Sequence, residues 1–351
     1  MRRRVELLAV AGLVVIVACG GEKGSPPPTS PGPTPPGTQV DPLRDGARAS
    51  GKLVGTAVQS SLFADGRYSS VLSRHFNYLT AEYEMKWDAI EHTRGASNFG
   101  PGDSIVGYGL ANGMRIKGHT LIWHASVPPW LGALSAVEFR AAFETHIREV
   151  AEHFRGQLYA WDVVNEAVAD DGTGLRDTVF RQKLGDQYIA DAFRLAKQAD
   201  PQALLFYNDY GGEALNQKSN RIYELVSSLR AQGVPIDGVG LQMHISASNP
   251  PAEANIAANM RRLASLGLLV NISEMDVRVR DLPTATRFEV QKSVYHSIVR
   301  VCVDEPRCDA VTLWGFTDAH TWISGDDPLP FDAQYAAKPA CYGVLDALWR
   351  R

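Results

Sequence analysis

The sequence has no excess of positive charge and no apolar stretch long enough to cross a bilayer as a helix. Its 35 Lys and Arg residues against 39 Asp and Glu residues give a formal net charge of −4. Nucleic-acid-binding proteins usually present a basic face, so this balance argues against a nucleic-acid partner. Apolar residues make up 45% of the 351 residues, which is enough for a sizeable core. The composition favours a globular protein whose substrate is neutral or weakly charged.

Metal-binding motifs are missing as well. The sequence has four cysteines but no C-x-x-C pair, and neither an H-x-H nor an H-E-x-x-H motif occurs. His119 and His124 lie on an expected strand and its exit, at a spacing that does not place both side chains on one face. We therefore expect no metal and no cofactor.

Three of the cysteines lie in the second half of the chain. Cys302 and Cys308 are close enough in sequence to close a short loop by a disulfide if the protein folds in an oxidising compartment. Cys341 would then remain as a buried free thiol.

Residues 1–19 predict a lipoprotein-type signal peptide. Arg2–Arg4 form a basic start, and residues 7–18 form an apolar core of 12 residues, which is too short to span a bilayer. The core ends at Ala18-Cys19, in a context that resembles a bacterial lipobox, so processing would leave Cys19 as a lipidated N-terminus. The alternative is ordinary signal cleavage beside an incidental cysteine. We expect an exported protein in a bacterial cell envelope (outer membrane, periplasm or cell surface) whose only membrane contact is its lipid anchor.

Residues 20–42 predict a spacer between this anchor and a folded domain. Seven prolines lie between Ser25 and Gly37, and such a composition favours extended polyproline geometry and cannot bury a core. The remaining residues, 43–351, show no second shift in composition and predict one domain.

This domain alternates short apolar runs with longer amphipathic ones. The clearest amphipathic run begins at Ser135, with Glu138 completing a capping box, and places apolar residues at helical spacing as far as Phe154. Eight such units predict a single (β/α)8 TIM barrel of the α/β class. A doubly wound sheet is the runner-up, but no G-x-G-x-x-G follows the first expected strand. The expected strands are 52–58, 78–81, 115–122, 159–165, 204–209, 239–244, 268–274 and 310–316, and the further expected helices are 186–199, 220–232, 254–266 and 288–301.

Polar residues end most of the expected strands. In a barrel, the carboxyl ends of all strands meet at one cavity, and the active sites of barrel enzymes lie there. The sequence therefore predicts a cavity lined by acidic, amide and imidazole side chains. These strand-end residues are Glu82, Glu84, His119, Asn165, Glu166, Asn208, Asp209, Gln242, His244, Glu274 and Asp276.

Glu166 and Glu274 are the strongest candidates for catalytic carboxyl groups. They end the fourth strand and the seventh, so they are expected to face each other across the barrel mouth. Paired carboxyl groups suit the cleavage of a glycosidic bond, because one protonates the leaving oxygen while the other attacks the anomeric carbon. Either glutamate alone could instead form a structural ion pair with Lys or Arg. That alternative is much weaker as an explanation of two such glutamates at strand ends together.

Seven segments resemble glycoside hydrolase family 10, the endo-β-1,4-xylanases, in the same order and with similar spacing. The resemblance covers the expected barrel, and an N-E pair alone would be far less specific. It implies a retaining endo-β-1,4-xylanase that acts on xylan and xylo-oligosaccharides as a monomer and needs no cofactor. The segments are 82–87, 118–124, 161–167, 207–210, 240–244, 273–276 and 312–315.

The resemblance also implies roles for individual residues. Glu166, which follows the Asn of the N-E pair, corresponds to the acid/base, and Glu274 corresponds to the nucleophile. Glu274 must stay ionised, and His244 is the expected partner that holds it, oriented in turn by Asp276. Asn165 is placed to bind the sugar 2-hydroxyl, a contact that strengthens in the transition state.

Further strand-end residues are expected to bind the substrate. Trp314 closes the eighth strand and Trp322 lies on the loop after it, where the resemblance places both around the sugar at the cleavage point. Glu82 and Lys86 resemble the groups that hold the next sugar. The full expected binding set is Glu82, Lys86, His119, Trp123, Asn165, Tyr210, Gln242, His244, Trp314 and Trp322.

Two positions depart from the family pattern. The family usually carries Asn where this chain has Tyr83 and Gln where it has Ser126, and both are expected to line the subsite on the non-reducing side of the cleavage point. The loss of two amides predicts weaker binding there. Two rival functions remain: a related glycosidase that acts on a mixed-linkage glucan or an aryl cellobioside, and a catalytically silent glycan-binding protein. The intact pair of Glu166 and Glu274 argues against the second.

Overall fold

The computed structural model describes residues 41–350. The predicted signal peptide, the lipidation site Cys19 and nearly all of the predicted spacer lie outside the described residues. Within residues 41–350, none of the helices combines the length and the apolar character needed to cross a membrane.

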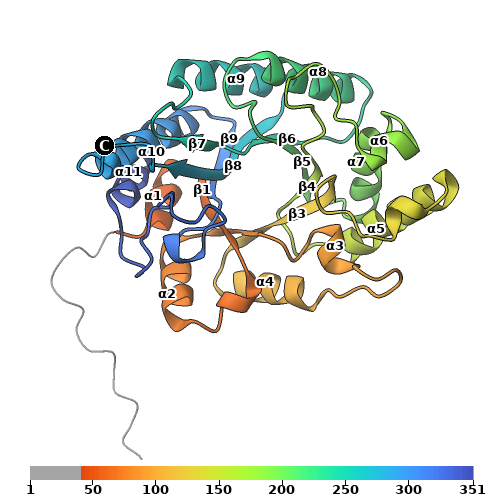
Figure 1. Ribbon diagram of the computed structural model, residues 1–351, viewed down its shortest axis with the longest axis horizontal. Helices are drawn as coiled ribbons and strands as arrows, with labels where there is room; N and C mark the ends of the chain where they lie inside the picture. Colours follow the sequence, from red (N-terminus) through yellow and green to blue (C-terminus); the bar gives the residue numbers. More distant parts are fainter. Residues whose placement is uncertain (1–40, 351) are drawn as a thin grey trace, which may run out of the picture. The chain divides into compact units, whose positions relative to one another are not determined.

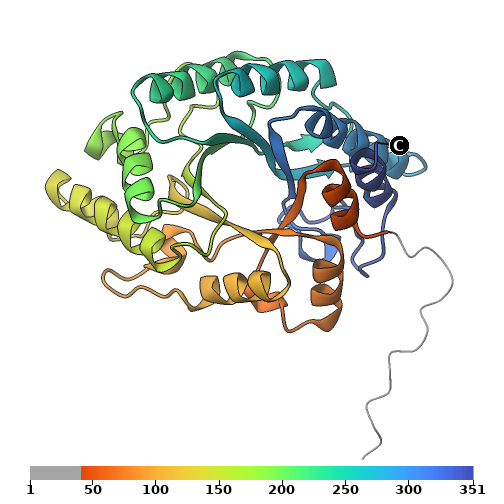
Figure 2. The same ribbon diagram turned by 180° about the vertical axis from the view of Figure 1, so that it is seen from behind.

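A closed ring of parallel strands forms the centre of the described domain, which confirms the predicted single (β/α)8 TIM barrel. Strands that follow one another in the ring pair in parallel, and the pairing of β6 with β8 closes it. Helices surround the ring on the outside, as the two opposite views show (Figures 1 and 2). The barrel strands are β1 (Leu53–Val58), β2 (Tyr78–Ala81), β3 (Arg115–Trp123), β4 (Ala160–Asn165), β5 (Leu204–Asp209), β6 (Gly238–Leu241), β8 (Leu269–Arg278) and β9 (Cys308–Leu313).

The helices cover the outer faces of these strands and bury the apolar side chains that point away from the barrel axis. The run after Ser135 forms a helix with the predicted capping box, and its apolar side chains Phe139, Phe143 and Ile147 are buried. The helices are α1 (Leu43–Ser50), α2 (Gly66–His75), α3 (Trp87–Ile90), α4 (Gly100–Ala111), α5 (Ala136–His153), α6 (Val179–Leu184), α7 (Tyr188–Ala199), α8 (Gln217–Ala231), α9 (Glu253–Ser265), α10 (Arg287–Asp304) and α11 (Pro339–Leu348).

The prediction of one continuous sixth strand over residues 239–244 is wrong, because the extended conformation is interrupted within this segment. Strand β6 ends at Leu241, and a separate short strand, β7 (His244–Ser246), follows. Between them Met243 has a φ of 69°, which no extended strand can accommodate. β7 pairs with the outer end of β8 and sets His244 opposite Asp276.

The cysteines are arranged as the sequence predicted. Cys302 in α10 and Cys308 at the start of β9 form a disulfide. Cys341 in α11 is a buried free thiol.

Candidate active site

A cavity of about 550 Å³ opens at the carboxyl ends of the barrel strands. Glu166 and Glu274 both line it, and so does every residue of the expected binding set. Tyr83 also lines the cavity, and three further lining residues were not predicted: Gly211, Glu213 and Arg278. The expected binding residues found there are Glu82, Lys86, His119, Trp123, Asn165, Tyr210, Gln242, His244, Trp314 and Trp322.

Glu274 is held from two sides. Asn208, near the end of β5, donates from Nδ2 to Oε1 of Glu274 at 2.6 Å. His244 donates from Nε2 to the other carboxylate oxygen at 3.1 Å, and its Nδ1 donates to Oδ2 of Asp276 at 2.7 Å. A continuous hydrogen-bonded chain therefore runs from Glu274 through His244 to Asp276.

The charges along the Glu274–His244–Asp276 series of hydrogen bonds keep Glu274 ionised. Burial alone would raise the pKa of Glu274, but the hydrogen bond from His244 and the positive charge near the carboxylate lower it to about 2. Burial would likewise lower the pKa of His244, but Asp276 and Glu274 raise it to about 10. At neutral pH a protonated His244 therefore donates to two carboxylates, and Glu274 faces the cavity as an anion.

Glu166 lies directly after β4 in a different environment. Trp123 donates from Nε1 to Oε2 of Glu166 at 2.7 Å, and Gln242 donates from Nε2 to Oε1 at 3.1 Å. Both donors are neutral, whereas the imidazole that holds Glu274 is charged. Glu166 also has a φ of 58°, a left-handed conformation that costs a non-glycine residue about 1–2 kcal/mol.

Asn208 connects the surroundings of the two carboxyl groups. Besides contacting Glu274, its Nδ2 donates to Oδ1 of Asn165 at 2.9 Å, and Asn165 Nδ2 donates to Oε1 of Glu166 at 3.3 Å. Ser273 fixes the Asn208 amide by donating from Oγ to its Oδ1 at 2.6 Å. The sequence placed Asn208 at a strand end, two barrel strands before Glu274, and within a segment that resembles family 10, but it gave Asn208 no individual role.

Lys86 and Glu82 form the polar wall on the β2 side of the cavity. Lys86 Nζ lies 4.4 Å from the centre of the Trp123 ring. Burial lowers the pKa of Lys86, and the nearby Glu274 and Glu82 oppose that shift. Glu82 accepts a hydrogen bond from Gln59 Nε2 at 3.1 Å, and burial raises the pKa of its carboxyl group. Both side chains are therefore fixed in place and offer donors and acceptors to a ligand.

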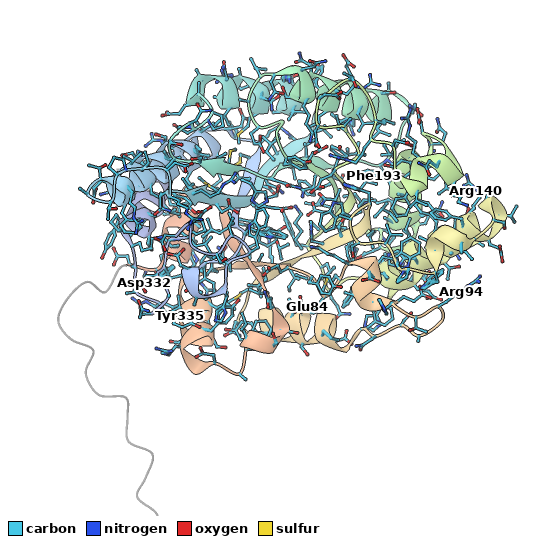
Figure 3. All side chains as sticks on the ribbon, viewed as in Figure 1. Glu84, Arg94, Arg140, Phe193, Asp332 and Tyr335 are labelled. Atoms are coloured by element: carbon cyan, nitrogen blue, oxygen red, sulfur yellow. A yellow bond between two sulfur atoms is a disulfide. The ribbon has the colours of Figure 1, made fainter. Side chains whose placement is uncertain are left out.

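Glu84, the next acidic residue after β2, takes no part in the cavity wall. Its carboxylate accepts hydrogen bonds from the backbone N–H groups of Ser60 and Tyr83 and so holds the loop. Glu84 is labelled in Figure 3.

His119 lies above a buried ion pair inside the barrel. Its Nδ1 contacts Oδ2 of Asp162 at 3.0 Å, and Lys117 Nζ lies 2.6 Å from the other oxygen of Asp162. Lys117 and Asp162 are each 1% exposed, and such a pair is retained only when the partners satisfy each other. The pair fixes the imidazole ring and leaves its other edge free to face the cavity.

Two tryptophans form the aromatic part of the wall. Trp314 is almost fully buried and packs edge-on against His119, with ring centres 5.1 Å apart. Trp322 is 57% exposed, yet its Nε1 donates to Oδ2 of Asp276 at 2.9 Å. This bond ties the loop that carries Trp322 to the chain holding Glu274.

Tyr83 and Ser126 differ in their relation to the cavity. Tyr83 is 51% exposed and lines it. Ser126, expected beside Tyr83, is not part of the lining; it is buried, and its Oγ has no hydrogen-bond partner among the described residues. The cavity lining therefore includes Tyr83 but not Ser126, contrary to the expectation that both line the subsite.

Among residues 41–350, no group of three or more His, Cys, Asp or Glu side chains is arranged to hold a metal ion. One ionised carboxylate and one carboxyl group among neutral donors form the pair that a double-displacement cleavage of a glycosidic bond requires.

Known proteins are similar to this chain in sequence and fold. The sequence model of Glycosyl hydrolase family 10 matches residues 42–347. Endo-1,4-beta-xylanase B of Thermotoga neapolitana is 39% identical over 326 residues, which cover 89% of this chain and 93% of that protein. The endo-1,4-beta-xylanase of Agaricus bisporus is 37% identical over 308 residues, covering 85% and 92%.

Solved structures agree with the sequence comparison. The crystal structure of xylanase 10B from Thermotoga petrophila RKU-1 in complex with xylobiose aligns with a TM-score of 0.85 at 37% identity, over 90% of this chain and 99% of that one. Native xylanase 10B from Thermotoga maritima aligns with a TM-score of 0.85 at 38% identity, over 88% and 98%. This chain belongs to glycosyl hydrolase family 10.

Proposed function

We propose that this chain is an endo-1,4-β-xylanase that hydrolyses internal β-1,4-xylosidic bonds of xylan and xylo-oligosaccharides with retention of configuration. The observation that carries the proposal is the contrast between Glu274, held as an anion by a protonated His244, and Glu166, held by neutral donors in the same cavity. The relatives that match nearly their full length are named endo-1,4-beta-xylanases, which supports xylan as the substrate.

In the first step, Glu166 gives its proton to the glycosidic oxygen while Glu274 attacks the anomeric carbon. The bond between that carbon and the leaving oxygen breaks, and a glycosyl ester of Glu274 forms. In the second step, the Glu166 carboxylate takes a proton from water, and the water oxygen displaces Glu274. Two inversions return the original configuration, and Glu166 is again protonated.

The remaining residues of the cavity bind the sugars. Asn165 is oriented by Asn208 and by Gln242, which both donate to its Oδ1. Its Nδ2, which contacts Glu166 Oε1, would donate to the 2-hydroxyl of the reacting sugar. Trp314 and Trp322 offer apolar ring surfaces for sugar faces. Glu82 and Lys86 would hold the next sugar on the non-reducing side.

We also propose that the enzyme is exported, anchored in the cell envelope through a lipidated Cys19, and monomeric. The basic start, apolar core and lipobox-like ending of residues 1–19 support export and anchoring. For the monomer, the support is that large exposed apolar side chains are scattered. Among the described residues they are Tyr83 and Trp322 at the cavity and Leu110, Val137 and Leu215 on separate segments, which leaves no contiguous patch for a stable interface.

The mechanism is tested with Glu274→Ala. This variant should fold but lose kcat by a factor on the order of 10⁴ or more, because the covalent intermediate cannot form. Added azide would enter from the vacated face and give an α-configured xylosyl azide. A β-configured azide would mean that Glu166 and Glu274 have exchanged roles, and substantial residual activity would remove Glu274 from the chemistry. Faster product release from a mixed-linkage β-glucan than from xylan would overturn the proposed substrate.

A further inference from the structure

The segment that follows β4 carries Glu166 and then folds back on itself. Val168 and Leu175 pair in an antiparallel bridge, so the two ends of this loop lie side by side. The loop positions the backbone of Glu166, and the backbone in turn determines where its carboxyl group enters the cavity.

The N–H groups at the start of the loop are all held by β5. Glu166 N donates to Asn208 O at 2.8 Å. The next two N–H groups, of Ala167 and Val168, both donate to the Tyr207 hydroxyl, at 3.1 and 3.2 Å. These bonds hold one side of the left-handed turn at Glu166.

The carbonyl groups of the same three residues all accept hydrogen bonds from one residue, Arg176. Its Nε donates to Glu166 O at 3.1 Å and its Nη2 to Val168 O at 3.4 Å. Its backbone N–H donates to Ala167 O at 2.7 Å. The guanidinium can contact the carbonyl groups of Glu166 and Val168 together because its N–H donors lie in one rigid plane.

Arg176 is itself oriented from outside the turn. Its Nη2 lies 2.6 Å from Oδ1 of Asp170 and 3.1 Å from the Tyr210 hydroxyl. Tyr210 also contacts Asp170 and lines the cavity, whereas Arg176 does not line it. The guanidinium therefore acts on the cavity only through the residues that it holds.

We propose that Arg176 is a positioning residue for proton transfer: by holding the carbonyl of Glu166 in its left-handed conformation, it aims the Glu166 carboxyl group at the glycosidic oxygen. This inference rests on the proposed role of Glu166 as the acid/base. A rotation of the freed Glu166 peptide would displace the carboxyl group, and a misplacement of about 1 Å can cost a reacting group about 100-fold in rate.

Aryl β-xylobiosides with different leaving groups test the proposal. Phenol, with a pKa of about 10, needs a proton in order to leave, whereas 2,4-dinitrophenolate leaves without one. Arg176→Met should lower kcat/KM on the phenyl substrate by about 10- to 100-fold and on the dinitrophenyl substrate by less than about threefold. Azide should raise kcat of this variant on the dinitrophenyl substrate, giving the β-azide, because Glu166 is also the base of the second step.

Arg181→Met is the matched control. Arg181 holds the other end of the same loop, donating to Leu175 O at 3.0 Å and pairing with Asp186 at 2.7 Å, but it does not contact Glu166. Its loss should leave the ratio of the two kcat/KM values unchanged. Arg176→Lys keeps the charge beside Asp170 but lacks the planar arrangement of donors. It should lower the ratio of kcat/KM on the phenyl substrate to kcat/KM on the dinitrophenyl substrate, and it provides the test if Arg176→Met does not fold.

The outcomes separate this inference from the proposed function. An equal loss on both substrates in either Arg176 variant, or no loss at all, would show that Arg176 only stabilises the loop and would overturn the inference. Glu166→Ala serves as the reference. If it lacks the leaving-group dependence and the β-azide product, the proposed role of Glu166 fails; if it shows both and the Arg176 variants show neither, only the inference fails.

Discussion

His244 is the residue that makes Glu274 different from Glu166. An imidazole buried in a protein normally loses its proton, because burial disfavours the charged form. Here the two carboxylates of Glu274 and Asp276 lie within hydrogen-bond distance on either side of the ring and raise its pKa to about 10. The resulting cation stabilises the anion that must attack the sugar, so the reactivity of one glutamate is set by a residue that need not touch the reacting carbon.

This arrangement predicts the acid limb of the pH profile. In the protein as it stands, Glu274 with a pKa of about 2 is ionised across the working range. In His244→Gln the charge is lost while a donor remains, so burial should raise the pKa of Glu274. The midpoint of the acid limb of the kcat/KM profile should then shift to higher pH by at least about one pH unit, equivalent to about 1.4 kcal/mol. His92→Gln, at an imidazole whose side chain is 70% exposed, is the control and should leave the limb in place.

The same pair makes a prediction for stability. The raised pKa of His244 contributes stability that is complete below its unfolded value of 6.5 and is lost as the pH rises through about 10. The lowered pKa of Glu274 contributes stability that is present above 4.5 and is lost as the pH falls through about 2. Urea unfolding should therefore show the gap between the wild type and His244→Gln narrowing from pH 6.5 to pH 10. A gap that stays constant would mean that the ring is neutral.

Tyr83 predicts an unusual dependence on substrate length. Its half-exposed ring lies at the cavity beside Glu82 and Lys86, and its hydroxyl is 3.4 Å from Asp88. An Asn at this position could donate to a sugar hydroxyl and accept from one, and each neutral hydrogen bond is worth about 0.5–1.5 kcal/mol. Tyr83→Asn should therefore raise kcat/KM on xylobiose and xylotriose several-fold, with less change on polymeric xylan. A lowered value on the short substrates would show that the ring is a productive stacking surface.

At the scale of helices and strands, prediction from the sequence succeeded where the signal is local. Helix α5 has a capping box and apolar residues at regular spacing, and both are present in the structure. Helix α4, GPGDSIVGYGLA, was not predicted because glycine and proline have low helix propensity. Gly109 is needed for close packing, because a Cβ there would lie 2.9 Å from the Ile116 side chain. Such a requirement comes from the neighbouring strand and leaves no pattern in the helix itself.

The site shows the same limit. Residues at strand ends were predicted because the barrel brings every strand end to one place, and the cavity lining contains seven of the eleven. The other four, Glu84, Asn208, Asp209 and Asp276, lie outside the lining. Arg176 and Glu213 lie in loops whose path no periodicity describes. Arg176 acts on Glu166 through a backbone carbonyl group. Every residue has a backbone carbonyl group, so the sequence does not show which one needs a side-chain donor.

The disulfide that joins the end of α10 to β9 predicts a defined loss of stability. Its cysteines are six positions apart, and closing so short a loop in the unfolded chain is worth about 2 kcal/mol. Spread over the unfolding entropy of a domain of this size, that corresponds to a Tm lower by about 3 °C. The double variant Cys302→Ala with Cys308→Ala should show this shift.

Reductant separates cross-linking from packing. Dithiothreitol should destabilise the wild type and Cys341→Ala alike in urea unfolding, because both keep the disulfide, and should have no effect on the double variant. A reductant effect that persists in the double variant would mean that the disulfide is not its source.

At the scale of the whole molecule, the proposed lipid anchor at Cys19 is separate in sequence from the barrel that holds the cavity. Among residues 41–350, no helix is long and apolar enough to cross a membrane. The domain also presents few large exposed apolar side chains. With Cys19 as the proposed anchor, the enzyme should leave the envelope as soon as that anchor is removed.

Cys19 makes that expectation testable. A single acyl chain gives only marginal membrane binding, whereas several chains on one residue, at about 0.8 kcal/mol for each buried CH₂, hold a protein stably. Mass spectrometry of the mature envelope-bound protein should show a lipidated Cys19 as its first residue. Cys19→Ala should release active enzyme of unchanged kcat into the soluble fraction, while Cys341→Ala should not. Envelope-bound protein that still carries Met1, or Cys19→Ala protein that stays bound to the membrane fraction, would rule out the lipid anchor and point to a different attachment.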